Sequence, residues 1–136
     1  SKIGLRSQYY KLNRVVQKYF TNDYDVYVRI RPDIKINNFP NIEFINKMSL
    51  ENSIVVNSEY WYRAPYNRDW CNEMVWITDK NSFKESNEIF LNFEKLVNQI
   101  DVHFGETFMA KNIQNMLSDG IIDNVLTFNF DYRVIR

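Results

Sequence analysis

Apolar residues recur at three- to four-residue spacing in three stretches of the chain, which is the pattern of amphipathic helices. These stretches are residues 7–20, 82–100 and 106–117. Ser7 is a suitable N-cap for the first stretch. Asp119-Gly120 ends the third, because glycine readily takes the left-handed conformation that closes a helix. The pattern therefore predicts three helices.

Shorter apolar runs, several of them alternating and rich in β-branched residues, are typical of strands. They cover residues 24–30, 53–56, 74–77, 125–130 and 132–135. The first strand ends at Arg31, because Pro32 cannot donate a hydrogen bond to a sheet. Helices interleaved with short strands predict an α/β fold, a small mixed sheet flanked by about three helices, as a single domain over residues 1–136.

Two connecting segments differ in character. Residues 37–41 have the composition of a turn. Residues 59–71 contain Pro65, alternate aromatic with polar side chains and carry few helix or strand signals. They indicate a long ordered loop of the kind that often serves function.

Charge and composition exclude several classes of protein. Lys+Arg and Asp+Glu number 17 each, so the chain has no net field to attract nucleic acid. Cys71 is the single cysteine, so no internal disulfide forms, and with only His103 beside it no Cys/His zinc site is expected. Cys71 is therefore expected to be a small buried residue. The lack of disulfides indicates a protein of a reducing compartment, the cytoplasm. No apolar run approaches the roughly 20 residues of a membrane helix.

The strongest candidate for chemistry is the segment Arg31-Pro32-Asp33 at the end of the first strand. Ligands of open α/β sheets bind beyond the carboxyl ends of strands, and Pro32 restricts the turn that presents Asp33. Arg29 lies two residues before Arg31, so both point to the same side while strand geometry lasts. A carboxylate that can bind Mg²⁺ or Mn²⁺, next to guanidinium groups that can hold a diphosphate, suits phosphorylated substrates. The structural alternative is an Asp that caps the turn and pairs with Arg.

The segment Tyr-Asp-Val-Tyr-Val-Arg-Ile-Arg-Pro-Asp-Ile, residues 24–34, resembles a motif of polysaccharide glycosyltransferases with an A-type, nucleotide-sugar-binding fold. These enzymes occur in bacteria and large DNA viruses. Residues 7–12 are similar to the helix before that strand, and residues 72–77 to a short strand on the acceptor side. Residues 105–108, Gly120 and residues 132–136 are similar to the family's C-terminal part.

The resemblance implies a function and roles for particular residues. The domain would move a sugar from a nucleotide-diphosphate donor to a glycan hydroxyl. Asp33 would hold Mn²⁺ or Mg²⁺ on the diphosphate, which Arg29 and Arg31 would bind. Glu106 would contact the acceptor hydroxyl or take its proton. The sugar and acceptor would contact Trp61, Trp70 and Glu73.

The resemblance also has departures. The family often carries Asp in its acceptor-side segment, where the nearest matches here are Asp69 and Glu73. Its N-terminal strands, which hold the nucleotide base, have no counterpart before Ser7, and the chain starts at Ser1 rather than Met. We therefore expect a part of a longer chain, an oligomer, or a reduced relative without catalysis. Abundant Asn, Ile and Lys with scarce Ala suit a giant virus, and hence a host cytoplasm, or a low-GC bacterium.

Other residues have a structural and a functional interpretation. Glu106 opens a helix, where a carboxylate also offsets the positive end of the dipole. His103 precedes that helix and is expected to be a surface or loop residue. An aromatic cluster with two arginines either anchors its loop or offers stacking faces to sugars or bases. Its members are Tyr60, Trp61, Tyr62, Arg63, Tyr66, Arg68 and Trp70.

Two other classes of function stay open. Asp25, Asp33 and Lys35 loosely match the carboxylates and lysine of Mg²⁺-dependent nucleases. Pro32 and the absence of net positive charge disfavour that match, and both carboxylates belong to one strand. A non-catalytic binding or assembly module is the other possibility.

Overall fold

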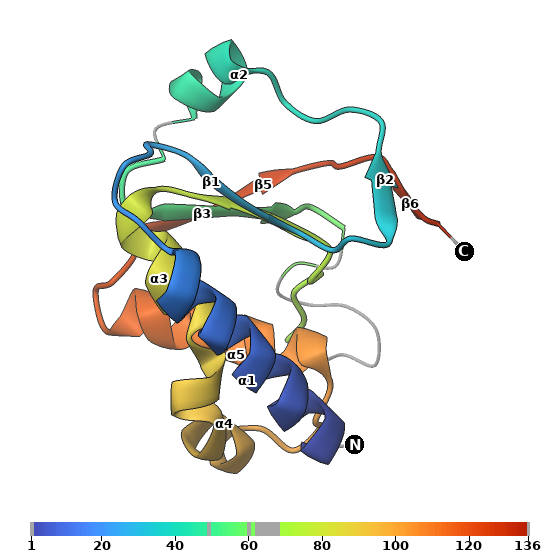
Figure 1. Ribbon diagram of the computed structural model, residues 1–136, viewed down its shortest axis with the longest axis vertical. Helices are drawn as coiled ribbons and strands as arrows, with labels where there is room; N and C mark the ends of the chain where they lie inside the picture. Colours follow the sequence, from blue (N-terminus) through green and yellow to red (C-terminus); the bar gives the residue numbers. More distant parts are fainter. Residues whose placement is uncertain (1, 49, 60, 62–68, 136) are drawn as a thin grey trace.

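The main sheet of the computed structural model has four strands in the order β1-β4-β3-β5 (Figure 1). The structure describes residues 2–48, 50–59, 61 and 69–135. The strands are β1 (Tyr27–Ile30), β4 (Val75–Thr78), β3 (Ser53–Asn57) and β5 (Asn124–Phe128). β4 is antiparallel to both β1 and β3, whereas β3 and β5 are parallel. The chain is therefore α/β with a small mixed sheet, as predicted.

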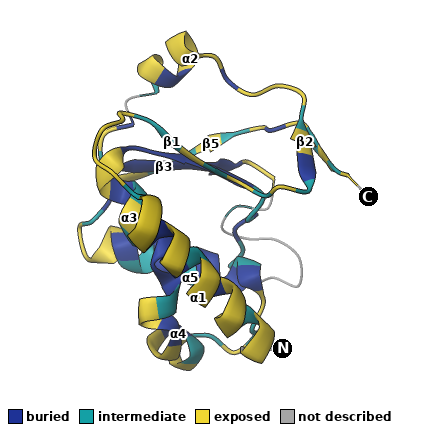
Figure 2. Cartoon of the chain, in the orientation of Figure 1, coloured by how far each residue is buried: buried dark blue, intermediate teal, exposed yellow. Residues whose placement is uncertain are grey.

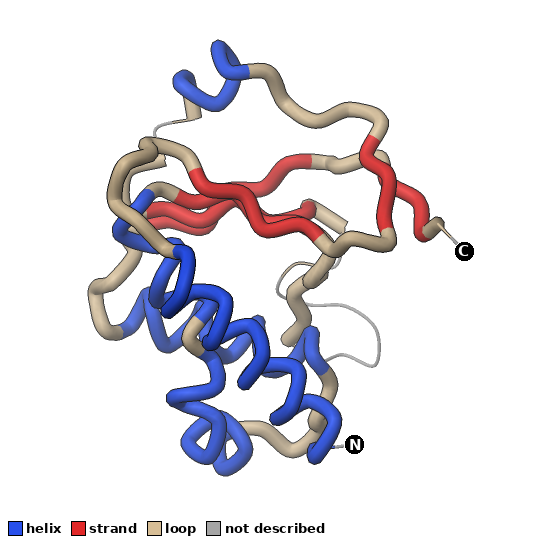
Figure 3. Tube along the Cα trace, viewed as in Figure 1, coloured by secondary structure: helices blue, strands red, loops and turns tan. Residues whose placement is uncertain are grey.

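A second sheet pairs β2 (Ile34–Ile36) with β6 (Tyr132–Val134) in antiparallel fashion. The helices lie on opposite sides of the main sheet (Figures 1 and 3). One side carries α1 (Lys2–Tyr19), α3 (Lys80–Asn87), the 3₁₀-helix η1 (Ile89–Asn92), α4 (Phe93–Gln99) and α5 (Gly105–Ser118). The other side carries α2 (Ile42–Lys47) and no further helix of the described residues.

The sheet separates two hydrophobic clusters, because successive side chains of a strand point to opposite faces. The helix-side cluster includes Ile54, Val56 and Trp76 from the strands and Tyr9, Leu96, Phe108 and Ile113 from the helices. The smaller cluster on the α2 side includes Val55, Val75 and Ile77 with Ile45, Leu50 and Phe130. Since both faces are covered, β3 and β4 are buried along their whole length (Figure 2).

The helix predicted over residues 82–100 is wrong as a single element. The helical segment begins at Lys80, where the Asp79 side chain caps α3, and it is divided into three helices, α3, η1 and α4. The side chains of Ser86 and Asn87 donate to the Phe83 carbonyl oxygen at 2.9 and 2.7 Å. Such bonds compete with the helical ladder and favour its end.

Other boundaries also differ from the prediction. α1 begins at Lys2, so Ser7 lies inside the helix and is not its N-cap. β1 is shorter than the predicted strand 24–30, and α2 and β2 were not predicted. The remaining strands and α5 match the predicted elements within two residues at each end. In the described part of the chain no helix is long and apolar enough to cross a membrane.

Candidate functional site

A cavity of about 900 Å³ lies between α1 and β1. Its walls are largely apolar and aromatic, with Leu12, Val16 and Phe20 from α1 and the residue after it, and Phe83 from α3. Its polar end is formed by Arg29, Arg31, Asp33 and Glu73. A ligand pocket of this size with a few convergent polar groups is the usual form of a small-molecule site.

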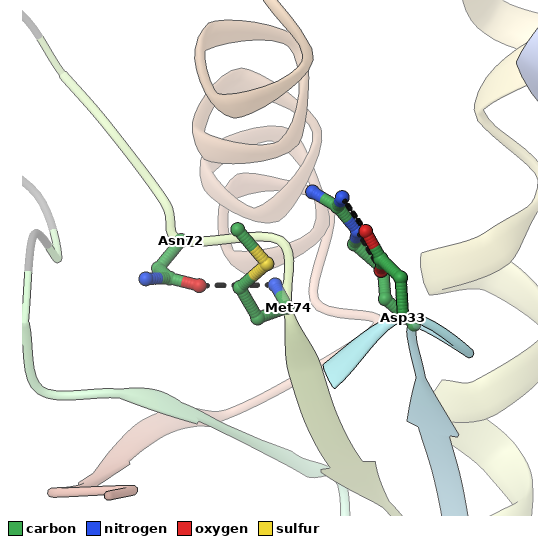
Figure 4. Close-up of polar contacts among 4 residues, drawn as sticks. Asp33, Asn72 and Met74 are labelled. Carbon is green, nitrogen blue, oxygen red and sulfur yellow. Dashed lines mark hydrogen bonds and ion pairs between the residues drawn. The ribbon is translucent and has the colours of Figure 1, made fainter. Parts of the chain in front are cut away.

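Arg31 and Asp33 lie in the turn between β1 and β2. The Arg31 N–H donates to the Met74 carbonyl oxygen at 3.0 Å, and the Ile135 N–H donates to the Asp33 carbonyl oxygen at 2.6 Å. The side chains form a bidentate pair, with Nε to Oδ1 at 2.9 Å and Nη2 to Oδ2 at 2.6 Å (Figure 4). This hydrogen bonding raises the pKa of Arg31. Both carboxylate oxygens of Asp33 thus accept from Arg31.

Arg29 lies on the helix-side face of β1, opposite Trp76 of β4. Its guanidinium carbon is 4.1 Å from the centroid of the Trp76 ring, a cation–π contact. The Nη1 atom is buried and has no hydrogen-bond partner. Burial lowers the pKa of Arg29, while Glu73 acts in the opposite direction. The Arg29 guanidinium is therefore removed from water and packed over the Trp76 ring, and its Nη1 donor has no acceptor.

Glu73 is positioned by its neighbour Asn72, in the segment that leads into β4. The Asn72 Oδ1 accepts from the Met74 N–H at 2.9 Å (Figure 4), and its Nδ2 donates to the Tyr132 hydroxyl at 2.9 Å. The Asn72 carbonyl oxygen also accepts from Trp76 Nε1 at 3.2 Å. These bonds fix the backbone on both sides of Glu73.

The Glu73 carboxylate packs directly against Gly105, the first residue of α5. A Cβ atom at position 105 would lie 2.6 Å from Glu73 Oε2, so a larger residue there would require the end of the Glu73 side chain to move. Oε2 is buried and has no hydrogen-bond partner. Burial, and next the charge of Glu106, raise the pKa of Glu73, while Arg29 and Arg31 act in the opposite direction.

The structure brings four of the predicted site residues together at this cavity: Arg29, Arg31, Asp33 and Glu73. Glu106, Trp61 and Trp70 are not among its lining residues. Glu106 lies in the first turn of α5, close enough to act on the charge of Glu73.

The predicted aromatic cluster lies elsewhere. Trp61 pairs with Cys71 in an isolated bridge and packs against the helix-side cluster. Trp70 packs on Phe104, with ring centroids 5.8 Å apart. The other members, Tyr60, Tyr62, Arg63, Tyr66 and Arg68, lie outside the described residues.

The nuclease-type residues are not brought together. Asp25 precedes β1, Asp33 follows it, and Lys35 is an exposed residue of β2. Among the residues that the structure describes, no group of three or more His, Cys, Asp or Glu side chains could hold a metal ion. His103 contacts the Val97 carbonyl oxygen at 3.2 Å, and Cys71 is fully buried, as predicted.

Several site residues were not predicted. Tyr27 and Phe83 stack with ring centroids 5.0 Å apart, and Phe20 stacks on Phe83 at 5.8 Å; these three rings are among the aromatic side chains that line the cavity. Tyr9 of α1 is fully buried, and its hydroxyl donates to the Gly105 carbonyl oxygen at 3.2 Å. Gly105 belonged to residues 105–108 of the resemblance, but nothing in the sequence indicated its contact with Glu73.

Comparison of the chain with protein-family models, with curated proteins and with solved structures gives no match.

Proposed function

We propose that this domain takes part in the transfer of a sugar from a nucleotide-diphosphate donor to a glycan hydroxyl, assisted by a divalent cation. The observation that carries the proposal is the meeting of Arg29, Arg31, Asp33 and Glu73 at the polar end of one cavity. The strand-end motif that suggested a diphosphate site thus borders a pocket large enough for a small ligand.

Arg31 and Asp33 are assigned to the diphosphate end. Their side chains are 35% and 40% exposed, so a ligand can reach both from solvent. A divalent cation would neutralise the charge that develops on the leaving diphosphate. Asp33 supplies a carboxylate of the kind that such a cation prefers.

Asp33 is paired with Arg31 in the ligand-free protein, which affects how it could bind a cation. Because Arg31 occupies both oxygens of Asp33, it has to release the carboxylate before Asp33 can bind a cation. The released guanidinium is then available to the diphosphate, for which its bidentate geometry is well suited. Glu106 remains the proposed acceptor-side carboxylate, close to Glu73.

The first prediction concerns Asp33→Asn. The wild type is expected to bind at least one nucleotide sugar in a Mn²⁺-dependent manner, and the variant to lose that dependence. Isothermal titration with a panel of nucleotide sugars, with and without Mn²⁺, measures both. The fold should survive, since a half-exposed ion pair contributes only about 0–1 kcal/mol to stability.

Asp25→Asn is the matched control, because Asp25 is exposed and lies at the other end of β1. Unchanged Mn²⁺-dependent binding in Asp33→Asn would remove Asp33 from the metal site. Absence of any nucleotide-sugar binding to the wild type would favour a non-catalytic binding module instead.

A further inference from the structure

Arg29 and Glu73 carry opposite charges and line the same cavity. The described contacts include no hydrogen bond or ion pair between them, although each influences the pKa of the other. Arg29 Nη1 and Glu73 Oε2 are both buried without a partner. Buried polar atoms are nearly always hydrogen-bonded. Two side chains of opposite charge that line one cavity, each with an unsatisfied atom, therefore favour a ligand that both accepts and donates hydrogen bonds.

The charges around this donor and acceptor balance. Arg31 is neutralised by Asp33, and Arg29 faces Glu73, so the polar end of the cavity has two positive and two negative groups. Without a divalent cation, such an end has no net attraction for an anion. A hydroxyl group suits it better, because one hydroxyl can accept from Arg29 while its neighbour donates to Glu73. Neighbouring hydroxyl groups are the defining feature of a sugar.

The adjoining wall fits the same ligand. Phe20, Tyr27 and Phe83 form a cluster of rings at the cavity, with all three pairs of ring centroids 5.0 to 5.8 Å apart. Aromatic faces of this kind pack against the C–H faces of sugar rings. The cavity therefore combines polar contacts for sugar hydroxyls with an apolar surface for the ring.

We propose that the cavity between α1 and β1 is the subsite for a neutral sugar, held by hydrogen bonds from Arg29 and to Glu73. Its role as a subsite of transfer rests on the function proposed above. The proposal moves Arg29 from the diphosphate to the sugar and places the sugar against Tyr27 and Phe83 rather than against Trp61 and Trp70.

The test is binding of neutral disaccharides in the absence of nucleotide and metal, which separates this subsite from the donor site. Maltose, cellobiose and lactose are titrated at millimolar concentration, with saturation-transfer NMR as a second readout. At least one is expected to bind the wild type. Glu73→Met and Arg29→Met, which keep an unbranched stem but remove the acceptor or donor, should weaken that binding about tenfold or more.

Glu43→Met and Arg14→Met are the matched controls, because both side chains are exposed and neither lines the cavity. The double variant Arg29→Met/Glu73→Met leaves no unpaired buried charge and serves if a single variant does not fold. Orthophosphate and diphosphate should not displace the sugar.

Three outcomes would overturn the subsite. They are no disaccharide binding to the wild type, unchanged binding in the folded variants, and displacement of the sugar by diphosphate. Disaccharide binding without nucleotide-sugar binding supports the subsite and removes the transferase function. Mn²⁺-dependent nucleotide-sugar binding without disaccharide binding removes the subsite alone.

Discussion

Glu73 is a carboxylate in surroundings that disfavour its charge. Its Oε2 atom is buried without a partner, and the charge of Glu106 adds to the effect of burial. Arg29 and Arg31 offset part of this penalty. A residue that costs stability in the ligand-free protein is typical of a binding site, where the ligand supplies the missing hydrogen bond.

The raised pKa of Glu73 predicts how stability depends on pH. At a pH between 4.5, the usual pKa of a glutamate, and the raised pKa of the folded state, Glu73 holds a proton in the folded protein that the unfolded chain has already lost. The free energy of unfolding therefore falls as pH rises from about 4.5 through the folded-state pKa. Glu73→Gln carries no charge at any pH and lacks this loss.

Urea denaturation of both proteins over a pH series measures the effect. The stability of Glu73→Gln relative to the wild type is expected to increase with pH and then level off. Glu88, whose pKa is also raised by burial, is present in both proteins and cancels in the difference. A difference that is constant with pH would show that Glu73 is not destabilised in its charged form.

At the scale of the elements, the start of α5 and the segment before β4 are fitted together through Gly105 and Glu73. Gly105→Ala is expected to cost about 1 kcal/mol, the low end of the range for overpacking, because the new Cβ atom would force the end of the Glu73 side chain to shift. In a Glu73→Ala background the same substitution should cost nothing, since alanine is the better helix former.

A double-mutant cycle from denaturant unfolding checks this coupling. Gly120→Ala is the control glycine variant. It is destabilised by a backbone φ of 73° and not by a neighbouring side chain, so its cost should not depend on residue 73. Equal costs for Gly105→Ala in both backgrounds would contradict the proposed overlap.

Some helices and strands could be predicted from the sequence and others could not. β3, β4 and α5 were predictable because their residues are apolar at nearly every position or at helical spacing. α2 and β2 have six and three residues, too few for a periodicity to be visible. The break after α3 depends on side-chain bonds to the Phe83 carbonyl oxygen, which compete with a pattern that is otherwise helical.

At the scale of the molecule, the two central strands hold both hydrophobic clusters together. β3 and β4 contribute to the cluster on each face of the sheet, whereas β1 and β5 lie at its edges. Native-state hydrogen exchange should therefore be slowest in the hydrogen-bonded amides of β3, β4 and α5. The amides of β1 and of the small β2–β6 sheet should exchange faster, and equal protection of β1 and β3 would contradict this order.

The candidate site could be predicted only in part, because some of its contacts join segments that are far apart in the chain. Arg29, Arg31 and Asp33 belong to one short segment, and their proximity follows from the sequence alone. Glu73 joins them only because β4 pairs with β1, with Trp76 opposite Arg29. The ring wall depends on α3 packing Phe83 against Phe20 and Tyr27, a contact that no local pattern indicates.

The close fit of Gly105 and Glu73 also limits how this protein can change in evolution. A side chain at position 105 would displace the carboxylate at position 73 from its present place, so each position limits what the other can hold. A homologue that enlarges position 105 is expected to have shortened position 73 first, and to have given up the acceptor that Glu73 provides. The two positions, 32 residues apart in the chain, should therefore be inherited as a pair wherever the site is kept.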